Sequence, residues 1–171
     1  MAGGRPDYQT GMLLVQHAMR NGSYEAVREI VSSLGKDNPH LKAFQRGHLA
    51  YLKGQSYDKE GRFQEAINCL EDALRLRPDA AYIHESLGRA YFRSGDYRRA
   101  IARYQSVLGR RSLDLKPAKL ANLHVALADA LDKSGEQLGA LEHYLRALQI
   151  DPDNRSAQAG ASALSGSPAR N

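Results

Sequence analysis

The stretch GQSYDKEGRFQEAINCLEDALRLRP, residues 54–78, places small, large and helix-breaking side chains in an order that recurs along the chain. The same spacing of positions returns from Gly88 to Val107 and again from Ala128 to Pro152. A poorer copy runs from Val15 to Pro39. Repetition over this length predicts stacked supersecondary units rather than one globular core. The recurring positions of the quoted stretch are Gly54, Tyr57, Gly61, Phe63, Ala66, Leu70, Ala73 and Pro78.

Two kinds of small residue indicate that the repeated unit is a pair of helices. Ala66, Ala100 and Ala140 fall where the two helices of a pair must cross closely, and a larger side chain would hold the backbones apart. Each run of helix formers ends at a glycine, which accepts the left-handed conformation that closes a last helical turn. We therefore expect a turn within each pair at Gly22, Gly61, Gly95 and Gly135.

This pattern resembles the tetratricopeptide repeat, in which antiparallel helix pairs stack one after another. The resemblance extends from about Tyr8 to Asp153, which is most of the chain. It implies an all-α fold, namely a right-handed superhelix (α-solenoid) of about four antiparallel helix pairs.

The repeat pattern also divides the chain into segments. Residues 1–7 have no periodicity and are expected to be a disordered N-terminus, and residues 155–171 a weak capping helix with a disordered tail. The tetratricopeptide repeat (TPR) domain between them is expected to cover 8–154. The extra residues after the first copy predict a long helix from Pro39 to about Glu60. The expected repeats are about 8–41, 47–80, 81–114 with an extension to 120, and 121–154.

Composition and motifs favour a folded protein without catalytic activity. Charged residues make up 25% and hydrophobic residues 42% of the chain, as in soluble domains. The sequence shows neither a signal-peptide core nor a stretch approaching a membrane span, so a cytoplasmic protein is expected. The histidines and the single cysteine lack the spacing of metal ligands, and no nucleotide-binding or hydrolase motif occurs. We expect no enzyme, no cofactor and no metal site.

The resemblance implies that the first helices of the pairs line a concave groove for a peptide or protein segment, as in an adaptor or scaffold. Arg89 and Arg93 flank Phe92 one helical turn apart, which suits an acidic or amphipathic segment. A homo-oligomer is left open. The predicted groove residues are Tyr51, Gln55, Lys59, Tyr82, Glu85, Arg89, Phe92, Arg93, Asn122, Asp129 and Lys133.

Two other functions are compatible with the sequence. The net charge of +5 is concentrated between Gly88 and Pro117, so the arginine-rich third repeat could bind an anionic partner such as a nucleic acid or an acidic surface. Nucleic acid is the less favoured partner, because the repeat core uses part of the aromatic residues there. A small TPR chaperone for secreted or assembling subunits is the other alternative, based only on fold-level analogy.

Overall fold

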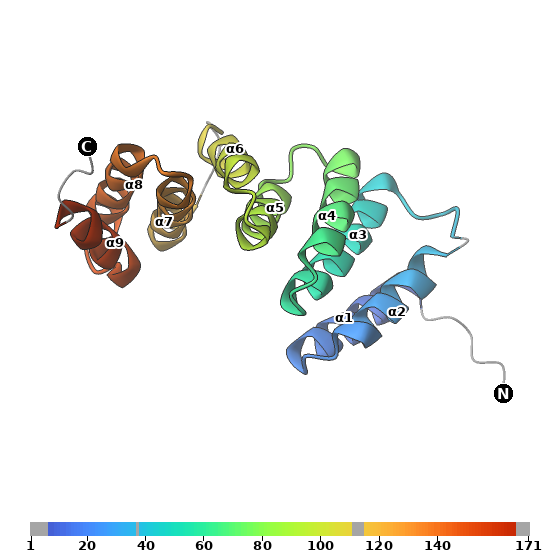
Figure 1. Ribbon diagram of the computed structural model, residues 1–171. Coiled ribbons are helices and arrows are strands. Elements are labelled where there is room, and N and C mark those ends of the chain that lie inside the picture. Colours follow the sequence, from blue (N-terminus) through green and yellow to red (C-terminus); the bar gives the residue numbers. More distant parts are fainter. Residues whose placement is uncertain (1–6, 37, 111–114, 167–171) are drawn as a thin grey trace. The chain divides into compact units, whose positions relative to one another are not determined.

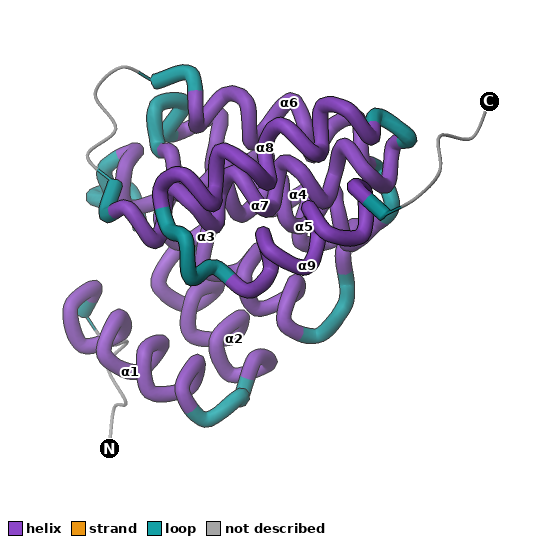
Figure 2. Tube along the Cα trace, turned by 90° about the vertical axis from the view of Figure 1, so that its left-hand side faces the viewer, coloured by secondary structure: helices purple, strands orange, loops and turns teal. Residues whose placement is uncertain are grey.

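The computed structural model describes residues 7–36, 38–110 and 115–166 (Figure 1). Within these ranges the chain forms nine α-helices joined by loops, and no strand (Figure 2). The helices form consecutive antiparallel pairs, which confirms the expected all-α fold. Their bounds are α1 Tyr8–Arg20, α2 Tyr24–Gly35, α3 Ala43–Lys59, α4 Phe63–Leu76, α5 Ala81–Ser94, α6 Tyr97–Leu108, α7 Pro117–Ser134, α8 Gln137–Ile150 and α9 Arg155–Ser165.

In each pair, a glycine with a positive φ angle lies in the turn after the first helix. The φ angles are +71° at Gly22, +78° at Gly61, +87° at Gly95 and +92° at Gly135. A residue with a Cβ atom adopts this left-handed region only at a cost, so glycine is favoured at each turn. The prediction of a turn at these four positions is confirmed.

Side-chain caps are present at the starts of α1, α6 and α9. The Asp7 carboxylate accepts the Thr10 N–H at 2.8 Å, so Asp7 belongs to the start of α1 and not to the N-terminal segment assigned from the sequence. The Asp96 and Asn154 side chains likewise accept N–H groups of α6 and α9. Each bond satisfies a donor that has no partner inside the helix.

The helix expected from Pro39 begins instead at Ala43. Leu41 precedes it as a loop residue and is only 5% exposed, because its side chain packs into the core of the first two pairs. The Lys42 N–H donates to the Gln45 side chain at 2.9 Å, which places the start of α3 immediately after Lys42. The prediction was wrong because burial of Leu41 outweighs the fit of proline in a first helical turn.

The chain divides into two structural units, residues 1–90 and residues 91–171, and the boundary falls inside α5. In the first unit α1 packs on α2, α2 on α3 and α3 on α4. In the second α6 packs on α7, α7 on α8 and α8 on α9. The three predicted crossing residues Ala66, Ala100 and Ala140 are fully buried, as the close approach of paired helices requires.

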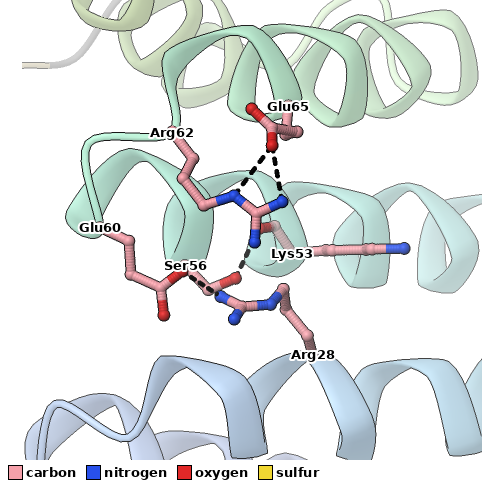
Figure 3. A network of polar contacts seen from close by, with 6 residues as sticks. All are labelled: Arg28, Lys53, Ser56, Glu60, Arg62 and Glu65. Carbon is pink, nitrogen blue, oxygen red and sulfur yellow. Dashed lines mark hydrogen bonds and ion pairs between the residues drawn. The ribbon is translucent and has the colours of Figure 1, made fainter.

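Charged and aromatic side chains join the first two pairs on one side of the first unit. The Arg28 guanidinium of α2 donates to the Glu60 carboxylate at 2.8 Å, at the end of α3, while Arg62 holds Glu65 (Figure 3). Both guanidinium groups lie over the Tyr57 ring, each 4.7 Å from its centroid. This arrangement ties α2 to the end of α3 by stacking and by an ion pair.

Helix α9 covers the end of the second unit. Ala157 and Ala161 are buried, and Gly160 lies so close to Tyr144 of α8 that an added Cβ would be 2.3 Å from the ring. The Tyr144 hydroxyl in turn donates to Asp129 of α7 at 2.5 Å. The segment expected to form a weak capping helix is therefore a docked helix as far as Ser165.

Candidate functional site

One face of α3 presents a row of four side chains that are only partly buried, although Leu52 among them also packs against the core of the first unit. We call His48, Tyr51, Leu52 and Gln55 the α3 stripe, because their spacing puts them on one side of the helix. All four side chains are half-buried, so each has an atom that solvent or a ligand can reach. Leu49, the residue after His48, is 4% exposed and belongs to the core.

A cavity opens between the α3 stripe and α1. Its volume is about 440 Å³. Apolar side chains form much of its lining, and two amides and a guanidinium add polar groups, a combination typical of ligand pockets. The lining residues are Val15, Gln16, Met19 and Arg20 of α1 and Leu52 and Gln55 of α3.

Aromatic contacts continue the α3 stripe toward α5. The Tyr51 ring meets Tyr82 edge-on, with centroids 4.7 Å apart and planes at 80°. The Gln55 amide donates to the Tyr51 hydroxyl at 2.6 Å, which fixes both side chains relative to each other. His48 lies 3.3 Å from the Tyr8 hydroxyl through Nδ1 and stacks on Tyr51. Three helices of the first unit therefore contribute rings to one surface.

Arg77, at the end of α4, completes this aromatic group. Its guanidinium lies over the Tyr82 ring, 5.4 Å from the centroid, and its aliphatic stem occupies the space beside Gly47. Burial raises the pKa of the Tyr8 and Tyr82 hydroxyls, and the Arg77 charge opposes that rise. Burial lowers the pKa of His48, and the Arg77 charge lowers it further. The surface is electropositive at this end.

The six sequence-predicted groove residues of the first unit do not all lie at the α3 stripe. Tyr51, Gln55 and Tyr82 lie in or beside the α3 stripe as described above. Arg89 pairs through Nε with the Asp58 carboxylate at 3.2 Å, and the Asp58 side chain is only 3% exposed. Arg89 therefore neutralises a buried acid. Of the remaining two, Lys59 is exposed at the end of α3 and Glu85 is half-buried on α5.

Several predicted groove residues of the second unit have structural partners. Asn122 accepts a hydrogen bond from the Asn154 amide at 2.9 Å, and Asp129 accepts from Tyr144. The Phe92 ring packs on Tyr97 with centroids 5.5 Å apart. Arg93 and Lys133 are exposed. The assignment of these residues to a binding groove stays a prediction.

Sequence reasoning missed the residues that α1 and the end of α4 contribute. Gln16 and Met19 lie in the poorest copy of the repeat, where the pattern gave little reason to expect a binding surface. Arg77 immediately precedes the helix-breaking Pro78, outside the first helices that the resemblance assigns to the groove. The equivalence of Gln16 to Gln55 in the repeat register is the signal that could have identified the α1 side.

The arginine-rich third repeat is partly committed to internal contacts. Arg99 donates to Asp96 at 2.5 Å and lies over the Tyr91 ring, 4.8 Å from its centroid. An arginine held by an acid and a ring contributes less to attracting an anionic partner. Among the described residues, no group of three or more His, Cys, Asp or Glu side chains is arranged to hold a metal ion. None of the helices in the described ranges has the length and apolar character needed to cross a membrane.

Comparison with known families identifies the class of protein. The family model described as "Tetratricopeptide repeat" matches residues 51–114 and 86–155, which together cover more than half of the chain. The chain belongs to the tetratricopeptide repeat family. Domains of this family are generally protein–protein interaction modules, and their repeat scaffold is typically non-catalytic.

Individual relatives match only part of this chain, and the matched region is a small part of each relative. The chain is 32% identical over 112 residues to "DnaJ homolog subfamily C member 7 homolog" of Schizosaccharomyces pombe, matching 61% of this chain and 23% of that protein. It is 32% identical over 108 residues to human "Superkiller complex protein 3", matching 60% of this chain and 6% of that protein. The chain thus spans less than a quarter of the length of these relatives.

Solved structures of similar fold have lower sequence identity. "MamA 41-end from Desulfovibrio magneticus RS-1" has a TM-score of 0.78 at 18% identity, covering 91% of this chain and 82% of that chain. "First TPR of Spaghetti (RPAP3) bound to HSP90 peptide SRMEEVD" has a TM-score of 0.63 at 20% identity, covering 75% of this chain and 96% of that one. These similarities support the fold.

Proposed function

We propose that the chain is a non-catalytic adaptor that binds a segment of a partner protein against the α3 stripe. The observation that carries the proposal is the cavity of about 440 Å³ between α1 and α3, which opens beside four half-buried side chains. The solved RPAP3 domain of similar fold is bound to a peptide, which supports a segment as the ligand.

The chemistry of the cavity suits an extended segment with an aliphatic side chain. Met19 and Leu52 supply apolar contacts for that side chain. The amides of Gln16 and Gln55 each carry donors and an acceptor, so they can bond to backbone N–H and C=O groups. Tyr51 adds a rigid aromatic surface at the cavity edge, a residue type enriched where binding energy concentrates.

Filling the cavity from α1 tests the proposal. Gln16 is exposed and lines the cavity, so Gln16→Tyr should occupy that space without disturbing the core. The wild-type chain is used to capture partners from a native extract at two salt concentrations, and each partner is then measured against purified variants. We expect Gln16→Tyr to weaken binding at least tenfold, about 1.4 kcal/mol.

His17→Tyr is the matched control, since His17 is also exposed on α1 but does not line the cavity. Circular dichroism should show the same helical content for both variants. Equal binding by Gln16→Tyr, His17→Tyr and the wild type would exclude the cavity as the binding site.

A further inference from the structure

Arg77 has no acidic partner in the part of the chain that the structure describes. Its guanidinium lies over the face of the Tyr82 ring, 5.4 Å from the ring centroid. Other partly buried arginines of the first unit have a carboxylate: Arg28 has Glu60 and Arg89 has Asp58. A half-buried cation without a counter-ion is electrostatically favourable to an incoming anion.

The groups around Arg77 can donate hydrogen bonds to such an anion. The Tyr82 hydroxyl makes no hydrogen bond within the described residues, so its O–H is available. The Tyr8 hydroxyl and His48 Nδ1 are paired at 3.3 Å, and His48 directly follows Gly47, against whose backbone the Arg77 stem packs. A guanidinium beside phenolic and imidazole groups is a suitable environment for an oxyanion.

The position of Arg77 is fixed by close packing. An added Cβ at Gly47 would lie 2.8 Å from the Arg77 Cγ, so the arginine stem rests directly on the backbone of α3. His48, the next residue, is the first member of the α3 stripe. The cation therefore lies at one end of the surface to which the adaptor function is assigned.

We propose that Arg77, together with the Tyr8, His48 and Tyr82 side chains, forms a subsite for a carboxylate side chain of the bound protein segment. This inference rests on the proposed function and specifies the partner as an acidic segment. A carboxylate matches the guanidinium because its two oxygens can accept two parallel N–H groups.

The geometry also sets the spacing of the motif. The Arg77 stem packs on α3 at Gly47, directly before His48. The cavity is lined from α3 by Leu52 and Gln55. The midpoints of these two pairs of α3 residues are about six residues apart along the helix, which is about 9 Å at 1.5 Å per residue. An extended segment covers that length with about three residues. The bound motif is then an aliphatic residue and an Asp or Glu about three positions apart.

Asp79 is an acid that lines a shallow cavity with Arg77, Phe44 and Leu76. It has an interaction of its own, and its charge opposes a second carboxylate nearby. Asp79→Asn is therefore expected to tighten binding of an acidic segment, whereas an uncharged segment should bind equally well.

Peptide selection on the full chain tests the subsite. A display library of random twelve-residue peptides is selected on the wild type, on Arg77→Gln and on Arg75→Gln. Arg75 is the matched control, because it carries the same charge on α4 but is exposed and paired with Asp72. We expect the wild type and Arg75→Gln to enrich an acid about three positions from an aliphatic residue, and Arg77→Gln to retain only the aliphatic preference.

A selected peptide and its twin with Asn or Gln in place of the acid then give a quantitative result. The acidic peptide should bind the wild type at least tenfold more tightly than its amide twin does, which is the range expected for a charge-assisted hydrogen bond. The two peptides should bind Arg77→Gln with equal affinity. An acid preference that survives in Arg77→Gln would overturn the subsite and leave the adaptor function standing. If the wild type enriches no peptide, the adaptor proposal fails, and the subsite fails with it.

Discussion

Replacing Gly160 with alanine tests whether α9 is docked on the second unit. The new Cβ would lie 2.3 Å from Cζ of Tyr144, a ring that is only 5% exposed and held by its hydrogen bond to Asp129. Because the ring cannot easily move, the overlap should cost about 1–3 kcal/mol. Burial of the Ala157 and Ala161 methyl groups supplies about 1.5 kcal/mol of docking energy.

The overpacking cost is therefore of the same order as the docking energy that these two methyl groups supply. Alanine gains about 1 kcal/mol over glycine in helix propensity, but an undocked helix of this length is marginal in water. We expect Gly160→Ala to release α9 while α6, α7 and α8 stay folded. Amide hydrogen exchange followed by NMR should show loss of protection confined to residues 155–165.

Gly139→Ala is the matched control, because its added Cβ would meet Leu131 at an ordinary 3.6 Å. This variant should gain up to about 1 kcal/mol of stability from helix propensity and keep α9 protected. If Gly160→Ala raises the melting temperature as Gly139→Ala does, with α9 still protected, then the close contact between α9 and Tyr144 is wrong.

Three further predictions concern packing, pH and the Arg28 network. Ala100→Leu should lower the free energy of unfolding by about 1–3 kcal/mol in a urea titration, since Ala100 is fully buried, and an unchanged midpoint would mean that the repeat register is misassigned. Burial lowers the pKa of His124 and His143, whose Nδ1 atoms lie 3.0 Å apart. The unfolded chain therefore binds protons first below about pH 6.5, so stability should fall as the pH drops through that value, and replacing both histidines with Asn should flatten the slope. Arg28→Ala should cost about 1–2 kcal/mol through loss of stacking and of the Glu60 ion pair, whereas Arg75→Ala, at an exposed pair, should stay within about 0.5 kcal/mol in the same titration.

The sequence alone determined the helix pairs and their turns, because those features depend on local chemistry. A turn with positive φ favours glycine whatever lies around it, so Gly61 and Gly135 mark helix ends directly in the sequence. A close helix crossing needs a small residue at a fixed place in each unit, so Ala66 and Ala140 could be assigned from spacing. Both features repeat, and repetition separates them from chance.

The sequence could also identify which helix face carries Tyr51 and Gln55, but not which side chains on that face remain available to a ligand. Helical spacing gives a direction for each residue and no information on its partner. Helical spacing places Asp129 on the face predicted to line a groove, yet its carboxylate already accepts a hydrogen bond from the Tyr144 hydroxyl.

The tertiary structure decided the composition of the candidate site. Tyr8, Gly47, Arg77 and Tyr82 come from four separate elements and meet only because those elements pack together. The lack of an ion pair at Arg77 in the described residues is a property of that packing, since the chain contains 19 acidic residues and composition alone does not say where they lie. Pair energies depend on distance and burial, which the order of residues does not specify.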